Sequence, residues 1–390
     1  MKKVIVLSAT LSVALFATHG DNLIGAGTKS RAIAGAASST YLGAESIFIN
    51  PALLTKASKS EFSIGTTLFM PDVTAKNSNA SGEVAKSKSD FEVIPYLGYV
   101  KSIDDKSSFG IGLFSVSGMG VDYSDEPVQK GLAGMKTHLV YAKLSTVYAR
   151  SFGKLSLGGG VDISYGDLEM HMINQFDGSD LGSNGDSHIG AGYHLGANYE
   201  FNENIDFSLT YTSEVHMKYK GVFDFNFDGT KDDLTLTQPA EVGTAVAYSI
   251  DSLRLEADYK RIFWSKADGY KDFQWDDQNV ISLGATWNYN EKWTFRGGYS
   301  YAKSPLHNKE YKDGVVEGFP FPSQQIAFFN LVGFPAITQT HYSVGASYKI
   351  DDAIQINAAY VYAPKATESF AGIEASNSQS SFSFGLDYRF

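Results

Sequence analysis

Cysteine is absent from the 390 residues of the chain. Disulfide bonds and thiolate metal sites are therefore excluded, and such a chain can cross an oxidising compartment without mispairing. Beyond the N-terminus there is no run of about 18 apolar residues, which argues against a helical membrane protein. Acidic residues outnumber basic residues, and the formal net charge is −11. That balance argues against a nucleic-acid partner and favours a soluble or surface-exposed acidic protein.

Residues 1–20 have the pattern of a secretory signal peptide. Lys2 and Lys3 form the basic end, and a short apolar core follows from Val4 to Phe16. Small residues then permit cleavage after Ala17 or Gly20. We therefore predict an exported protein with a signal peptide over residues 1–20.

Residues 25–56 differ from everything that follows, because they are rich in Gly, Ala and Ser and show no alternation. Small residues let backbone pack closely on backbone, and the Asn50-Pro51 step demands a sharp turn. A flexible arm, the alternative, would leave several apolar side chains in water. These are Ile33, Tyr41, Leu42, Ile47, Phe48, Ile49, Leu53 and Leu54. We predict that residues 21–56 form a compact hatch around which a β-barrel closes.

Most of the chain from residue 57 onward alternates polar and apolar residues with a period of two. In 292–302 the apolar face carries Trp293, Phe295, Gly297, Tyr299 and Tyr301. The same alternation recurs in 205–216 and 253–260. Successive side chains of a strand point to opposite faces, so each segment is an expected strand with one apolar face. A soluble sandwich would show this pattern too.

The spacing of the turns favours a membrane barrel. Short turns are expected at 102–106, 152–154, 202–204, 251–252, 290–291 and 351–352. Long polar connections alternate with them near 71–88, 118–136, 167–187, 218–238, 265–278, 304–339 and 365–380. This order gives about fourteen strands of roughly ten residues, with short turns at one end and long loops at the other. We predict an all-β fold, an antiparallel transmembrane β-barrel over residues 57–390 in a bacterial outer membrane.

Aromatic residues support the same prediction. Several are expected near strand ends, where interfacial girdles lie: Tyr99, Tyr148, Tyr165, Trp264, Trp275, Trp287 and Tyr289. The last segment alternates aromatic or aliphatic residues from Phe382 to Phe390. Such a strand would be an aggregation hazard at the edge of a soluble sheet. It resembles the C-terminal signal that the outer-membrane assembly machinery recognises, and Phe390 is the residue expected to contact that partner.

Several motifs resemble one family. The segment SRAIAGAASS…GAESIFINPALL, with Asn50-Pro51-Ala52, is similar to the N-terminal hatch of the FadL-type family of outer-membrane long-chain fatty-acid transporters, which includes aromatic-hydrocarbon uptake proteins. ISLGATWNYNEKWTFRGGYSYAKSPL resembles a strand–turn–strand of that family, and GFPAITQTHYSVGASYKI with INAAYVYAPK its last-but-one hairpin. The resemblance implies a fourteen-stranded barrel plugged by its hatch. It also implies passive uptake of hydrophobic molecules, in particular long-chain fatty acids.

The resemblance further implies a lateral opening where the hatch meets a kinked third strand. Here the expected third strand is 107–118, with Gly110 and Gly112 inside it and two more glycines at 118 and 120. Glycine inside a strand weakens pairing or marks a close backbone approach. Our hypothesis is that Asn50 and Pro51, followed by Ala52, pack into a gap that Gly110 and Gly112 help create. Alternatively, these glycines only make room for the hatch.

Three cations on the expected lumen face are candidate substrate ligands, namely Arg296, Arg254 and Lys260. A half-buried arginine can hold a carboxylate through a bidentate pair. The alternative is a ladder of salt bridges with Glu256 and Asp258. Arg296 is the preferred candidate, because the matching family segment lies near the substrate cavity.

Two other patterns point to different chemistry. His341 and Ser343 share a strand face, as in an outer-membrane lipase, but an orienting partner is missing. With a two-residue turn at 351–352, they would lie opposite Tyr362 and Tyr360. The loop 224–232 follows the first half of a calcium site, yet Thr235 stands where the bidentate Glu belongs. We predict no metal, no cofactor and no enzyme activity.

Hydrophobic uptake therefore leads the functional predictions. Its partners would be a long-chain fatty acid or another hydrophobic small molecule and the outer-membrane lipids, and we expect a monomer. A plugged lumen argues against a general porin. A structural or adhesive surface barrel and a lipase are the alternatives, and the sequence leaves fatty acid and aromatic hydrocarbon both open.

Overall fold

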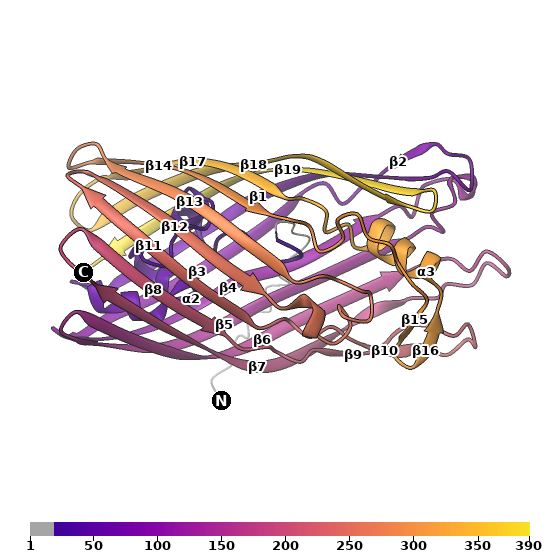
Figure 1. Cartoon of the computed structure of the whole chain (residues 1–390), viewed down its shortest axis with the longest axis horizontal. Coiled ribbons are helices and arrows are strands. Elements are labelled where there is room, and N and C mark those ends of the chain that lie inside the picture. Colours follow the sequence, from indigo (N-terminus) through magenta and orange to yellow (C-terminus); the bar gives the residue numbers. More distant parts are fainter. Residues whose placement is uncertain (1–18) are drawn as a thin grey trace, which may run out of the picture.

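In the computed structural model, which describes residues 19–390, fourteen antiparallel strands close into one barrel (Figure 1). Each barrel strand pairs with the next one along the chain, and β19 pairs with β1 to close the wall. The barrel strands are β1 (Glu61–Asn77), β3 (Glu92–Asp104), β4 (Ser107–Asp122), β5 (Lys136–Phe152), β6 (Leu155–His171), β7 (Ser183–Glu200), β8 (Ile205–Thr212), β11 (Glu241–Ile250), β12 (Leu253–Ile262), β13 (Gln278–Asn288), β14 (Trp293–Ala302), β17 (Thr340–Lys349), β18 (Ile354–Phe370) and β19 (Ile373–Arg389). The predicted fold class and strand number are confirmed.

The predicted signal peptide falls almost entirely on residues 1–18, outside the described residues. Over residues 19–390, every helix is too short or too polar to be a candidate for crossing a membrane.

The alternating sequence places one set of side chains outside the wall and the other inside. In β14, Tyr301 is 40% exposed whereas its neighbour Ser300 is fully buried. The outward set is apolar and suits lipid, while the inward set is small or polar. Outward Trp287 and Tyr289 are 45% and 57% exposed, as expected of a girdle. Trp264 and Trp275 were wrongly assigned to the girdle, because both are buried inside the barrel at its loops.

The two ends of the barrel differ, and we call them the short-turn end and the loop end. The C-terminus lies at the short-turn end (Figure 1). The loop end carries β2 (Val84–Lys86), η3 (Val128–Lys130), β9 (Lys218–Phe223), β10 (Asp232–Thr235), η4 (Trp264–Lys266), β15 (Gly314–Val316), β16 (Phe319–Phe321), α3 (Ser323–Phe328) and the π-helical turn η5 (Phe329–Gly333). Several strands extend into the expected loops, so the predicted length of about ten residues is wrong for half of the wall.

The connection between β18 and β19 is the clearest case. A long loop was expected over 365–380, but both strands continue through it and meet at a tight turn. Ala371 and Gly372 form that turn with positive φ angles of 48° and 87°. Two successive residues with positive φ give the turn whose twist matches a β-hairpin.

The register of β17 and β18 also differs from the expected one. Ser343 pairs with Val361, and Val344 with Tyr360. The turn is one residue longer than assumed, since Ile350 N–H donates to Ile354 C=O around three residues. The longer turn keeps outward tyrosines opposite outward residues.

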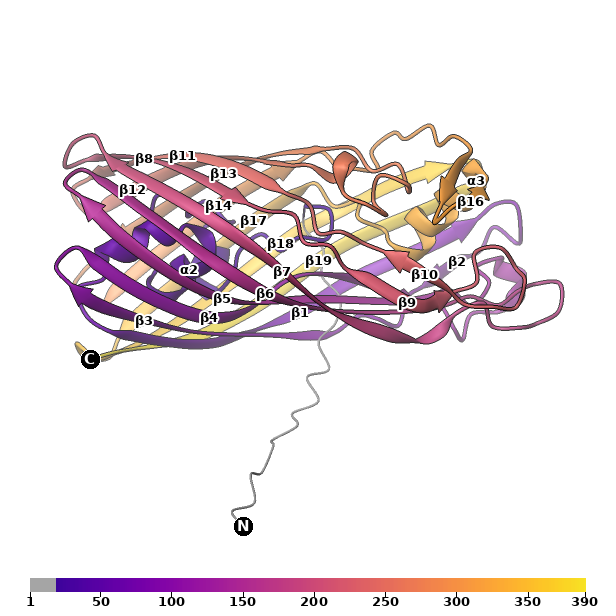
Figure 2. The ribbon, with the colours of Figure 1, turned by 90° about the horizontal axis from the view of Figure 1, so that it is seen from below.

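The N-terminal segment, residues 19–57, lies inside the barrel (Figure 2). It contains α1 (Thr28–Arg31), η1 (Gly43–Glu45), α2 (Ser46–Ile49) and η2 (Pro51–Lys56), all toward the short-turn end. Ile33, Ile47, Leu53 and Leu54 are at most 2% exposed. The apolar content that argued against a free arm is thus buried against the inner wall.

Candidate functional site

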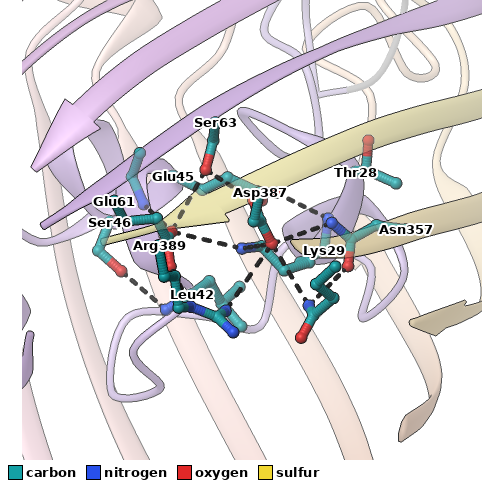
Figure 3. A network of polar contacts seen from close by, with 12 residues as sticks. Thr28, Lys29, Leu42, Glu45, Ser46, Glu61, Ser63, Asn357, Asp387 and Arg389 are labelled. Carbon is teal, nitrogen blue, oxygen red and sulfur yellow. Dashed lines mark hydrogen bonds and ion pairs between the residues drawn. The ribbon is translucent and has the colours of Figure 1, made fainter. Parts of the chain in front are cut away.

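A buried polar network joins the N-terminal segment to the seam between β1 and β19 (Figure 3). Lys29 Nζ lies 2.7 Å from Asp387 Oδ2 and 3.9 Å from Glu61 Oε1. Asp387 also accepts hydrogen bonds from Ser63 Oγ at 2.6 Å and Asn357 Nδ2 at 3.0 Å. Burial lowers the pKa of Lys29, but the carboxylates of Asp387, Glu61 and Glu45 outweigh this effect, and the pKa is raised. Lys29 is therefore a charged anchor.

Removing this anchor should release the segment. We expect Lys29→Met to cost roughly 3–5 kcal/mol of unfolding free energy, because it leaves the buried Asp387 without its cation. Lys56→Met is the matched control. Lys56 pairs with Glu200 and Asp206 at 3.3 and 3.0 Å but is 25% exposed, so its loss should cost about 1 kcal/mol or less. Denaturant unfolding in detergent compares the two, and equal losses would contradict this assignment.

A second set of contacts holds residues 37–40 against β12. The Asp258 carboxylate accepts hydrogen bonds from Ala37 N–H at 3.2 Å and Ser38 N–H at 3.0 Å. Glu256 accepts from Ser39 N–H at 2.5 Å and from the Thr40 hydroxyl.

Arg254 completes this attachment. It donates to Ser39 C=O at 2.8 Å and pairs with Asp206 at 2.6 Å. The guanidinium of Arg254 thus donates its hydrogen bonds to the N-terminal segment and to the wall.

The Asn50-Pro51-Ala52 element also lies against the wall, but not at the expected glycines. Asn50 Nδ2 donates to Ser38 C=O at 2.7 Å, and its Oδ1 accepts from Ala52 N–H at 3.1 Å. A Cβ on Gly196 would lie 2.0 Å from Asn50 Oδ1, and one on Gly158 2.5 Å from the Pro51 carbonyl carbon. The backbone of Pro51 therefore closely approaches β6, and the side chain of Asn50, which caps η2, closely approaches β7.

The expected packing of Asn50 and Pro51 on Gly110 and Gly112 is wrong. A Cβ on Gly110 would meet Leu54 and Ile47 at 2.7 and 2.8 Å, while one on Gly112 would meet Phe114 at 2.5 Å. Both glycines stand in regular pairing within β4. Glycines in a strand predict that some part of the N-terminal segment packs closely on it, but they do not identify which part.

Farther toward the loop end, the wall is interrupted between β3 and β4. Their pairing ends at Tyr96 and Phe114. Pro95, the next residue of β3, has no N–H to donate. On the other side β4 bulges, because Ser115 pairs with Ala142 and Ser117 with Tyr141, leaving Val116 extra.

Residues 21–23 of the N-terminal segment occupy the freed edge of β4. Leu23 N–H donates to Val116 C=O at 3.0 Å, and Gly118 N–H donates to Asp21 C=O at 3.1 Å. Asn22 thus forms an antiparallel bridge with Ser117. Burial raises the pKa of the Asp21 carboxyl to about 6, although Tyr270 O–H donates to it. Residues 21–23 thus replace β3 as the hydrogen-bonding neighbour of β4 beyond Phe114.

An inner cavity of about 80 Å³ lies beside this edge. Its lining includes Leu23, Ile24, Phe48, Ile49, Val116, Val280, Glu241, Asp258, Tyr259 and Lys260. Leu23 and Val116 belong to both the cavity and the interrupted wall. The cavity offers apolar surface with one charged end.

The three candidate cations are not brought together. Lys260 borders the cavity, where its Nζ lies 2.9 Å from Glu241 Oε2. Arg296 donates to Ser347 Oγ at 2.6 Å near the short-turn end. Sequence reasoning missed Lys143, whose Nζ lies 5.7 Å from the Phe48 ring centroid behind the cavity. The alternation in β5 marks it as inward, so the pattern could have found it.

The loop end holds a larger apolar groove of about 600 Å³. Its lining includes Met172, Ile173, Phe176, Leu181, Phe223, Phe227, Phe321, Phe328 and Phe329. Phe176 is 97% exposed, and an exposed aromatic patch marks an interaction site. Sequence reasoning missed this groove, since it combines residues of loops far apart in the chain.

Aromatic rings pack beside the groove and beside the N-terminal segment. Phe329 stacks on Phe273 at 5.9 Å between centroids. Trp264, Tyr270 and Trp275 form a cluster with centroid distances of 4.6 to 5.1 Å. Tyr270 contacts Asp21 of the N-terminal segment. The cluster is therefore continuous with the segment that lines the cavity.

Neither of the two other chemical patterns forms the site that it resembles. His341 and Ser343 face the lumen as predicted, and Ser343 Oγ donates to Ala32 C=O at 3.0 Å. In the loop 224–232, Asp224 accepts hydrogen bonds from Asp228 N–H and Gly229 N–H, and Asp228 accepts one from Thr230 N–H. These carboxylates shape turns within the loop. Within residues 19–390, no cluster of three or more His, Asp or Glu side chains could hold a metal ion.

The sequence was compared with known protein families. The family model described as "Outer membrane protein transport protein (OMPP1/FadL/TodX)" matches residues 7–315. One curated relative is the long-chain fatty acid transport protein of Escherichia coli O6:H1. It is 27% identical over 319 residues, which cover 66% of this chain and 71% of the relative.

Solved structures share the fold. A FadL homologue from Pseudomonas aeruginosa superposes with a TM-score of 0.73 at 16% identity, covering 95% of this chain and 100% of the other. The toluene transporter TodX from P. putida gives a TM-score of 0.71 at 21% identity, with 94% and 99% covered. At these identities the likeness shows the fold alone.

Proposed function

The chain belongs to the OMPP1/FadL/TodX family of outer-membrane transport proteins, and from this premise we propose that it takes up long-chain fatty acids by lateral diffusion through its own wall. It is an outer-membrane transporter of hydrophobic compounds and not an enzyme. The fatty acid is the substrate of several curated relatives by name, including the one from E. coli. One observation carries the proposed route: Leu23 and Val116 line the inner cavity and also form the interrupted wall.

The proposed path begins in the loop-end groove. A hydrophobic molecule gains free energy by leaving water for a surface of phenylalanine side chains. It then passes the aromatic cluster of Trp264, Tyr270 and Trp275 and reaches the inner cavity. Residues 29–56 remain in place as a plug, held by Lys29 and by the carboxylates of β12.

Exit occurs at the interruption between β3 and β4. Direct release into an aqueous compartment would lose the gain made on binding, so a route into the membrane is physically preferable. Residues 21–23 must leave the edge of β4 for this exit to open. Gly110 lies against Leu54 and Ile47 of the plug, and Gly112 lies against Phe114 of its own strand, so we assign both glycines a packing role rather than a gating one.

Uptake of labelled oleate into proteoliposomes tests this function. Oleate should enter faster than into vesicles with an unrelated barrel, and small hydrophilic solutes should not. A structural or adhesive barrel would show no such difference. Hydrolysis of an ester by the pure protein would instead favour the lipase.

Lys260 is the proposed ligand of the substrate carboxylate. We expect Lys260→Gln to weaken oleate binding by about 1–2 kcal/mol, the scale of a hydrogen bond to a charged group that is partly exposed to water. Binding of uncharged toluene should change little. Arg296→Gln is the comparison, because sequence reasoning preferred that residue. Isothermal titration decides: a loss with Arg296→Gln alone would return the carboxylate site to the short-turn end.

A further inference from the structure

Arg31 is a buried cation that lies outside the polar network around Lys29. The two residues are two positions apart in α1, so their side chains point to different sides of the helix. Arg31 is 2% exposed, and its Nη2 atom has no hydrogen-bond partner among residues 19–390. Burial lowers the pKa of Arg31 to about 10, and the guanidinium therefore remains charged near neutral pH. A buried charge is costly unless an opposite charge compensates it.

Glu45 is the carboxylate that acts on Arg31, but only through space. Its two oxygens accept hydrogen bonds from Lys29 N–H at 2.9 Å and from Ser30 N–H at 2.8 Å. Among the described residues no carboxylate forms an ion pair with Arg31. The guanidinium thus has a positive charge and a free N–H group that the protein itself leaves unmatched.

A small cavity adjoins Arg31 between α1 and the wall. Its volume is about 10 Å³, which is on the scale of one water molecule or one monatomic ion. Strands β1, β17, β18 and β19 form most of its lining, with His341, Gln379 and Ser381 as polar members. None of the described residues that line it is acidic. The cavity is therefore polar, positively charged and too small for an acyl chain.

His341 of β17 supplies a second polar group to this cavity. It is 1% exposed, and neither of its ring nitrogens has a hydrogen-bond partner within residues 19–390. An imidazole ring always carries at least one N–H donor. Buried polar groups without a partner are rare in folded proteins, and they mark places where a water molecule or an ion binds. Two such groups, from the N-terminal segment and from the wall, border the same cavity.

The charge of Arg31 distinguishes between these two ligands. A water molecule would accept hydrogen bonds from Arg31 and His341 but would leave the positive charge buried without compensation. An anion accepts the same hydrogen bonds and also neutralises the charge.

We propose that the cavity between α1 and strands β17 to β19 is a binding site for a monatomic inorganic anion, chloride in saline media, held by Arg31 and His341. The anion fastens α1 to the wall on this side, as Lys29 fastens it to the seam between β1 and β19. This inference goes beyond the proposed function, because it concerns the attachment of the plug and not the substrate.

Diffraction from crystals soaked in sodium bromide tests the site directly. Bromide takes the place of chloride and is identified by its anomalous scattering. We expect an anomalous peak within hydrogen-bond distance of Arg31 and His341, and no such peak in Arg31→Met. Density without an anomalous signal in the cavity would mean a water molecule and would overturn the proposal.

Thermal unfolding in detergent tests what the anion does. We expect the midpoint to be about 2–4 °C higher in sodium chloride than in sodium gluconate, the scale of stabilisation by one bound ligand. Gluconate is too large for the cavity, and equal ionic strength separates binding from general screening. The rise should saturate with chloride concentration, as binding to a single site does.

Three variants separate the site from other effects of salt. Arg31→Met should lose the chloride response, and in gluconate it should be at least as stable as the parent, because it removes a buried charge without a counterion. His341→Phe keeps the size of the ring without its N–H group. It should raise the chloride concentration for half of the effect about tenfold or more, as expected for one hydrogen bond to a charged group.

Lys56→Met is the matched control, since Lys56 is a partly exposed cation of the same segment, and it should keep the full response. Equal midpoints of the parent in the two salts, or an undiminished chloride response of Arg31→Met, would overturn the site.

Discussion

Gly298→Val should turn a closed barrel into an open pore. A Cβ at Gly298 would lie 2.2 Å from the carbonyl carbon of Ile33 and 2.6 Å from Ala34 N. Both are backbone atoms of a tight turn in which Ala34 and Gly35 have positive φ angles of 49° and 80°. Backbone held in such a turn cannot yield as a side chain does. The N-terminal segment must therefore withdraw from the lumen.

Its withdrawal should be measurable as conductance. A barrel with an unplugged lumen conducts ions through water, so single-channel current should rise about tenfold or more over the parent. Gly297→Val provides a matched control on the next residue. Its Cβ would point outward, with the nearest contact at 3.8 Å from Ser343 C=O. Both variants should remain heat-modifiable on gels. An unchanged, low conductance in a folded Gly298→Val barrel would contradict a plugging role for residues 29–56.

A disulfide between positions 22 and 117 should stop fatty-acid uptake. Asn22 and Ser117 face each other in an antiparallel bridge whose hydrogen bonds are made by their neighbours. Such non-hydrogen-bonded pairs bring Cα atoms to about 4.5 Å, which suits a disulfide. The double variant Asn22→Cys with Ser117→Cys would fix residues 21–23 on β4. Oleate uptake should fall to the level of vesicles without protein, and a reducing agent should restore it.

The controls isolate the lock from other effects of the substitutions. Asn22 Nδ2 donates a hydrogen bond to Glu241 Oε1 at 2.6 Å, and Asn22→Cys removes it. Each single-cysteine variant should nevertheless transport, which separates the effect of the disulfide from the loss of this bond. A second disulfide, Thr67→Cys with Ser383→Cys, joins β1 to β19 where the two hydroxyl oxygens are 2.7 Å apart. It tethers the wall but not the N-terminal segment. Normal uptake by the locked protein, with disulfide formation verified by mass spectrometry, would mean that substrate leaves by another path.

Local patterns predicted the barrel because its strands obey a local rule. Alternation in 292–302 assigns each residue of β14 to a face without knowledge of its neighbours. The ends of the strands were harder to predict. Residues 373–380 are largely polar, so they read as loop, yet a tight turn at Ala371 and Gly372 continues both strands. One residue in the turn before β18 was enough to shift the expected register.

The site was predictable only in part, for a physical reason. Alternation identified Lys260, Arg254 and Arg296 as inward-facing, and the structure places all three on the inner side of the wall. Which of them meets the cavity depends on where the N-terminal segment runs, and that path is set by contacts across the whole barrel. Asn22 contacts Glu241 across 219 residues of sequence. No spacing rule relates such positions.

The seam network has a consequence for how the protein is made. Lys29 and its partner Asp387 are separated by 358 residues, so the carboxylate is synthesised long after the lysine. Closing so long a loop costs entropy that only the finished seam repays. During biogenesis the contacts of the N-terminal segment with β4, β6, β7 and β12 are therefore available before the Lys29–Asp387 pair is. The anchor at Lys29 is completed only when β19 pairs with β1, so the last strand to be made fixes both the wall and the start of the plug.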